Sequence, residues 1–162
     1  MRIGGHGLRE HVSLLAPLFG LLGAVWLIRI ILGAAGAPSV VIRIASLTVV
    51  GPASALLAAV LIHSRQFGSY ANVVLSSFLL NGWVQLLIIT AIAFGTISGI
   101  ENVYTAPEFS MPYNDPYHIR HILGHLTVGL GIGSLVGAAE GCLLLWLLRR
   151  ITPGREPLTP YR

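Results

Sequence analysis

Four long segments of the chain are apolar, and shorter polar stretches separate them. The apolar segments cover residues 13–35, 39–62, 71–100 and 119–148. Each of them is long enough to provide the roughly 20 apolar residues that a helix needs to cross a lipid bilayer. The pattern therefore predicts an all-α integral membrane protein in which four transmembrane helices form one bundle.

The composition supports the same fold class. Of the 162 residues, 54% are hydrophobic and only 10% are charged, whereas soluble domains have about 25% charged residues. A chain of this length cannot bury so many apolar side chains within itself, and lipid must cover the rest. We therefore expect residues 1–151 to form a single transmembrane domain, followed by a short proline-rich tail at residues 152–162.

The arginines predict an orientation. The chain has ten basic residues, all of them arginine, and a formal net charge of +4. Arginines precede the first segment and follow the second and the fourth, whereas the connection at residues 101–117 has acidic residues and no arginine. Cytoplasmic loops are enriched in arginine and lysine, so we expect both termini on the cytoplasmic side of the cell membrane. No arginine cluster resembles a nucleic-acid site.

Prolines indicate two local features. Gly51 and Pro52 lie inside the second segment, where proline removes a backbone donor and should kink the helix. Pro107, Pro112 and Pro116 restrict the connection between the third and fourth segments. We expect this connection, about 17 residues long, to be an ordered outer loop.

Glycines recur at every fourth position of the fourth segment. Small residues at this spacing let another helix backbone approach closely. The partner helix can belong to the same chain or to another subunit, and the pattern does not distinguish the two. The four positions are Gly129, Gly133, Gly137 and Gly141.

Three histidines precede this glycine series. His121 and His125 are four residues apart and thus neighbours on one helix face, and His118 is one turn earlier. Two histidines at this spacing can chelate one metal ion, with Glu101 and Glu108 as further ligands on the same side of the membrane. A quinone-headgroup site, a proton-handling site and plain hydrogen bonding to the loop are alternatives.

Further charged residues are expected at the same membrane level. Arg29 lies near the outer end of the first segment, and Arg43 near the outer start of the second. They either extend to lipid headgroups or pair with acids of the long connection and hold it over the bundle as a lid. In the second case they would form an outer polar cap with Asp115 and Arg120.

Glu140 is the single acidic residue within the four segments. An ionisable group inside a membrane is a candidate functional residue. Asn81 and Gln85 of the third segment lie at a similar depth when residues are counted from the cytoplasmic side. We expect one of these two amides to donate a hydrogen bond to a neutral Glu140.

The remaining histidines do not indicate a further binding site. His63 ends the second segment on the cytoplasmic side, and His125 lies on the outer side, so the two are too far apart to ligate one haem. We therefore do not expect haem, and a metal ion or a quinone is the candidate cofactor. His6 and His11 precede the first segment, and we expect them to contact solvent or headgroups.

Three classes of function fit these features. The first is a non-enzymatic subunit or scaffold, in a homo- or hetero-oligomer with other membrane subunits, which the glycines and the small size favour. The second is a binding protein with a metal, quinone or proton-handling site at the outer cap. The third is a small transporter or channel protomer, for which Glu140 and the expected kink in the second segment are the only support. No nucleophile motif or phosphate-binding loop is present, and we expect no enzymatic activity.

Overall fold

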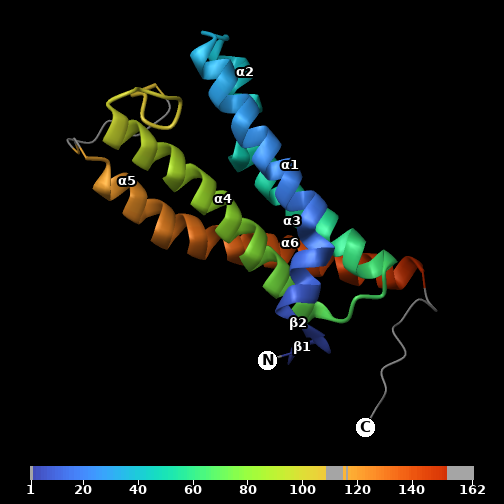
Figure 1. Ribbon diagram of the computed structural model, residues 1–162. Coiled ribbons are helices and arrows are strands. Elements are labelled where there is room, and N and C mark those ends of the chain that lie inside the picture. The colour runs from blue at the N-terminus through green and yellow to red at the C-terminus, as the bar shows by residue number, and fades with distance from the viewer. Residues whose placement is uncertain (1, 109–114, 116, 153–162) are drawn as a thin grey trace.

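The computed structural model describes residues 2–108, 115 and 117–152, most of which are helical (Figure 1). The chain begins with two short antiparallel strands and continues with a series of long helices. A π-helical segment, η1, lies between two of the helices. In chain order the elements are β1 (Arg2–Ile3), β2 (His6–Gly7), α1 (Leu8–Ala34), α2 (Ser39–Ile44), α3 (Leu47–Ser64), α4 (Tyr70–Ser98), α5 (Ile119–Gly124), η1 (His125–Gly129) and α6 (Leu130–Ile151).

Four helical stretches are long and apolar enough to cross a membrane. They coincide with the four apolar segments of the sequence, which confirms that part of the prediction. The first starts earlier than expected, at Leu8. The stretches are Leu8–Ala34, Ser39–Ser64, Tyr70–Ser98 and Ile119–Ile151.

The second stretch is interrupted upstream of the proline at which we expect a kink. The break lies at Ala45 and Ser46, whereas Pro52 lies within α3. The backbone N–H of Thr48 donates to the Ser46 hydroxyl, so Ser46 caps the N-terminus of α3. A capping serine, and not the proline, therefore determines where the helix restarts.

Helix α4 is central to the packing, because it contacts α1, α3 and α6. Figure 1 shows that α2 and α5, which follow α1 and precede α6, lie far apart at one end of the molecule. We call this the loop end, because residues 99–108 lie there. The opposite end, which we call the hairpin end, brings together β1, β2, the α3–α4 connection and the end of α6. There the Arg149 guanidinium donates to the Gly68 carbonyl at 2.9 Å.

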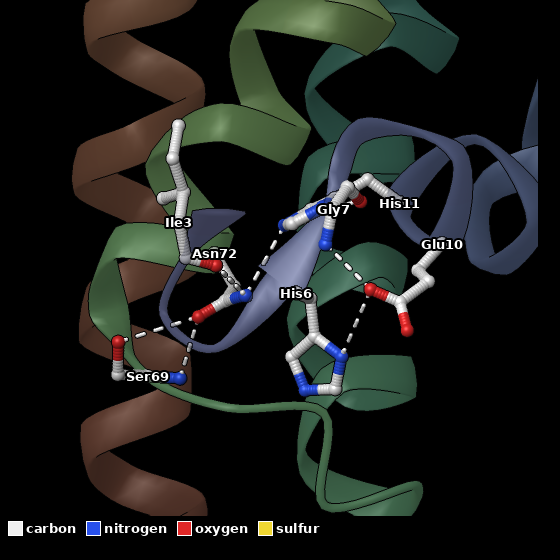
Figure 2. Close-up of polar contacts among 7 residues, drawn as sticks. All are labelled: Ile3, His6, Gly7, Glu10, His11, Ser69 and Asn72. Carbon is white, nitrogen blue, oxygen red and sulfur yellow. Dashed lines mark hydrogen bonds and ion pairs between the residues drawn. The ribbon is translucent and has the colours of Figure 1, made fainter. Parts of the chain in front are cut away.

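The hairpin end is organised by the side chain of Asn72, on α4 (Figure 2). Its Nδ2 donates to the Ile3 carbonyl at 3.0 Å and to His11 Nε2 at 3.1 Å. Its Oδ1 accepts from the Ser69 backbone N–H at 2.8 Å and from the Ser69 hydroxyl. The other ring nitrogen of His11, Nδ1, donates to the Gly7 carbonyl. All the donor and acceptor groups of this cluster are thus used within the protein.

This cluster corrects one expectation about the N-terminal histidines. His11 lies inside α1 and is 0% exposed, so it contacts neither solvent nor headgroups. His6 stacks on the Phe67 ring at a centroid distance of 3.8 Å. The turn between β1 and β2 consists of Gly4 and Gly5, both with positive φ, which is the geometry that a two-residue hairpin requires.

At the loop end, residues 99–106 lie between α1 and α4. Val103 and Tyr104 are buried, and Val103 fits against Gly33, where a Cβ atom would collide with it. The Arg29 guanidinium lies 4.8 Å from the centre of the Tyr104 ring and donates to the Ser46 hydroxyl at 3.1 Å. Burial raises the pKa of the Tyr104 phenol above its ordinary value, and the nearby Arg29 charge partly opposes this.

Candidate functional site

The histidines of the fourth stretch begin the candidate site. An aspartate fixes the start of α5, because the Asp115 carboxylate accepts from the backbone N–H groups of Ile119 and Arg120. From this start the helix places the His121 and His125 rings together, with their Nε2 atoms 3.2 Å apart. The expected contact between these two histidines is present. His118 is less close, since its ring centroid lies 6.4 Å from that of His121.

A continuous chain of hydrogen bonds leads from these histidines along the α4–α6 interface. His125 Nδ1 lies 2.7 Å from Gln85 Oε1, and Gln85 Nε2 donates to Asn81 Oδ1 at 3.1 Å. The Asn81 amide nitrogen ends the chain at the backbone carbonyls of the facing helix. We call the side chains of His121, His125, Gln85 and Asn81 the polar column.

The last link of the polar column lies where the helix is widened. Asn81 Nδ2 lies 3.0 Å from the carbonyl oxygens of Gly129 and Leu130 and 3.2 Å from the Ser134 hydroxyl. The backbone N–H of Leu130 donates to the His125 carbonyl, five residues earlier, as in a π-helix. Such wide turns are uncommon and are often found at functional sites.

The glycines of the fourth stretch make room for the column. A Cβ atom on Gly129 would lie 2.8 Å from Gln85 Oε1, and one on Gly133 would lie 2.7 Å from the Asn81 amide. Gly137 and Gly141 continue the series, against Ala55 and Ser77 and against Val73 respectively. The glycines therefore contact α3 and α4 of the same chain. They also allow the two amides to reach the backbone of the facing helix.

A cavity of about 370 Å³ lies beside the column. It is bounded by α3, α4, η1 and α6, and we call it the central cavity. Most of its wall is apolar, from residues such as Leu80, Val84 and Ile132. Its polar lining residues are Thr48, Ser77, Asn81, Gln85 and His125.

The structure places the amides differently from the sequence-based expectation. Asn81 and Gln85 bond to each other, to His125 and to the α6 backbone, and none of the hydrogen bonds found among the described residues joins them to Glu140. The expected amide–carboxyl hydrogen bond is therefore wrong. In the part of the chain that the structure describes, Glu140 Oε2 is buried and makes no hydrogen bond.

The predicted metal ligands do not form one group. Within residues 2–108, 115 and 117–152, no three histidine, cysteine, aspartate or glutamate side chains lie close enough together to hold a metal ion. Asp115 binds backbone N–H groups at the start of α5 instead. Glu101 and Glu108 line a separate cavity.

This second cavity lies at the loop end and has a volume of about 790 Å³. It is bounded by α1, α2, α4 and residues 100–108, with Trp26 and Phe94 in its wall. Of the other members of the predicted polar cap, Arg29 lies against Tyr104 and Ser46, as described above. Arg43 lies on an exposed face of α2, and Arg120 lies in the first turn of α5.

Two polar features were not predicted from the sequence. One is the Asn72–His11 cluster, for which the Gly4–Gly5 pair could have indicated a hairpin but not its partner. The other is Ser77, which is only 2% exposed and lines the central cavity. A serine in an apolar segment gives no signal of its own, because it can also bond to its own helix backbone.

Comparison of the chain with protein-family models, curated proteins and solved structures finds no match.

Proposed function

We propose that this chain is a multi-pass protein of the cell membrane, with both termini cytoplasmic, that binds a small molecule in its central cavity. The observation that supports the proposal best is the position of the polar column. Gln85, Asn81 and His125 lie in the wall of a cavity whose remaining surface is mostly apolar. A few well-placed polar groups in an apolar cavity are typical of small-molecule sites.

The structural context favours binding over a scaffold role. The glycines that suggested assembly with other subunits contact helices α3 and α4 of this chain, and their packing is accounted for without a partner. The π-helical turn and the two amides, of which Gln85 is buried, are costly features in an apolar bundle, because each amide must find partners. A binding site gives a reason for retaining them beside a cavity.

Native mass spectrometry of the detergent-purified protein tests the proposal. We expect a small-molecule adduct on the wild-type protein, and we expect the Gln85→Leu variant to lose it. Leucine keeps the approximate size of the side chain but removes both of its hydrogen-bonding groups. Far-UV circular dichroism and gel filtration establish that the variant is folded.

Thr127→Val is the matched control. Thr127 belongs to η1, is exposed, and its hydroxyl donates to the Leu123 carbonyl rather than lining the cavity. This variant should keep the adduct. Complete absence of an adduct from the wild-type protein, or an equal adduct on Gln85→Leu, would contradict the proposal and leave the column as a purely structural contact between helices.

A further inference from the structure

The hydrogen bonds of the polar column run in one direction. The Gly129 and Leu130 carbonyls can only accept, so the Asn81 amide nitrogen must face them and its Oδ1 must face Gln85. Gln85 then donates through Nε2 and accepts through Oε1.

The acceptors also determine which nitrogen of each histidine ring has the proton. His125 Nδ1 must bear the proton that is donated to Gln85 Oε1. In a neutral ring His125 Nε2 is then an acceptor, and His121 Nε2 donates to it. Each donor therefore points from the loop end toward the middle of the bundle.

The polar column is not suited to conducting protons. The column ends at peptide carbonyls and passes through two amides, and none of these groups readily releases one proton while taking up another. The column is therefore a fixed set of donors and acceptors that shapes the cavity, rather than a path for protons. Its role is recognition.

The central cavity favours an uncharged ligand. Among the described residues that line it, none is an aspartate, glutamate, lysine or arginine. A charged ligand in such an apolar wall would lose its hydration without gaining a counter-charge. The volume of about 370 Å³ suits one substituted ring rather than a long lipid chain.

Ser77 supplies a donor among the lining residues for which no described residue provides an acceptor. Its hydroxyl is buried and makes no hydrogen bond among the described residues. The residue lines the central cavity, and its Oγ would lie 3.6 Å from a Cβ atom on Gly137, so the absence of a side chain at Gly137 lets α6 approach Ser77 closely. A buried donor without an acceptor is unfavourable, more so than an acceptor that uses one of its two lone pairs.

We propose that the central cavity binds an uncharged ring compound with a carbonyl oxygen, and that the Ser77 hydroxyl donates to this oxygen. The inference rests on the proposed function and adds the chemical class of the ligand and its contact. Ser77 is thus a specificity-determining residue, and the carbonyl oxygen supplies the acceptor that no described residue provides at this position.

Direct binding of duroquinone, a tail-free and uncharged ring with two carbonyl groups, tests the inference on the full chain in nanodiscs. Isothermal titration calorimetry should detect binding to the wild-type protein. Ser77→Ala should weaken it about five- to tenfold, as expected for the loss of one hydrogen bond. In the infrared spectrum, the carbonyl band of bound duroquinone should lie at lower frequency with wild type than with Ser77→Ala.

Ser76→Ala is a closely matched control. Ser76 is the adjacent residue, is 0% exposed and also has a hydroxyl without a partner among the described residues, but it does not line the cavity. Its substitution should leave the affinity for duroquinone and the carbonyl band unchanged. A second probe, 2,3,5,6-tetramethylbenzoate, has the same four methyl groups on a benzene ring of similar size but has a negatively charged carboxylate, and it should bind at least tenfold more weakly.

The outcomes separate this inference from the proposed function. If the wild-type adduct depends on Gln85 but duroquinone does not bind, or binds equally to Ser77→Ala, the carbonyl contact is refuted and the binding function stands. Equal binding of the benzoate would refute the uncharged class. If neither an adduct nor any probe binds, both proposals fail.

Discussion

Two polar clusters on the same helix have opposite characters. At the hairpin end, Asn72 of α4 joins His11, Ser69 and the N-terminal strand, and each of its hydrogen-bonding groups has a protein partner. Nearer the loop end, Asn81 and Gln85 of α4 join His125 and His121, but the cluster borders a cavity, and His121 Nδ1 has no hydrogen-bond partner among the described residues.

The difference shows how a structural cluster can be distinguished from a binding site. Both clusters contain a buried amide and a histidine, so residue type does not separate them. What separates them is whether the hydrogen-bonding capacity is used up and whether space remains beside it. A complete cluster stabilises the fold, whereas an incomplete one next to a cavity can bind something else.

The largest effect is expected from removing the amide of the complete cluster. Asn72→Leu leaves the Ile3 carbonyl, the Ser69 N–H and His11 without their partner. We expect the free energy of unfolding to fall by about 3–4 kcal/mol. Asn81→Leu should cost less, about 1–2 kcal/mol, because the carbonyls it releases also belong to a helix. Unfolding in detergent by increasing SDS measures both losses, and an equal or larger loss for Asn81→Leu would contradict the expected difference between the two clusters.

A steric test addresses the closeness of the column to the facing helix. Gly133→Ala places a methyl group 2.7 Å from the Asn81 amide, and we expect a loss of about 1–3 kcal/mol in unfolding free energy. Gly131→Ala is the control, since nothing lies within 4 Å of its Cβ position. It should stabilise α6 by about 0.5–1 kcal/mol through helix propensity. Similar midpoints of SDS unfolding for the two variants would argue against tight packing at Gly133.

A pair of serine substitutions compares the two regions at the scale of one hydroxyl. Ser69 precedes α4 and donates to Asn72, so Ser69→Ala should lower stability by about 1 kcal/mol. Ser77 has no described partner to lose, and Ser77→Ala without ligand should leave stability unchanged or raise it by about 0.5 kcal/mol. Thermal unfolding of the ligand-free proteins in detergent measures both values. A clear loss in Ser77→Ala would mean that its hydroxyl is already bonded.

The smallest expected effect is spectroscopic. In wild type, His11 and His125 should both have the proton on Nδ1, because each donates to an oxygen through that atom. The Gln85→Leu variant should release this preference for His125 and keep it for His11. ¹⁵N NMR of histidine-labelled protein distinguishes the two neutral forms. An unchanged His125 spectrum would show that Gln85 does not select its tautomer.

The sequence was sufficient to predict the number and approximate extent of the four long helical stretches, because hydropathy and length are local properties. It was not sufficient for their ends. The start of α1 at Leu8 and the break at Ser46 depend on caps and long-range hydrogen bonds that an average over apolar residues does not reveal.

For the candidate site, local spacing was again the dependable part. The contact between His121 and His125 follows from helix geometry. The predicted partner of Asn81 and Gln85 was wrong because depth in the membrane was counted in residues from the helix ends. Such a count does not include the π-helical turn or the way in which α4 and α6 pack against each other. As a result the amides face Gly129 and Leu130, about 15 Å along the helix from Glu140.

The N-terminal hairpin also bears on the order of assembly. Ile3 and His11 receive their hydrogen bonds from Asn72, which lies 69 and 61 positions later in the chain. During synthesis, the first helix and its hairpin are complete before α4 exists, so the Ile3 carbonyl and His11 Nε2 lack their hydrogen bonds to Asn72 until then. The hydrogen bonds of the hairpin end can therefore form only after the third long helical stretch has been synthesised. In a nascent chain that stops before Asn72, the Ile3 carbonyl and His11 lack this partner.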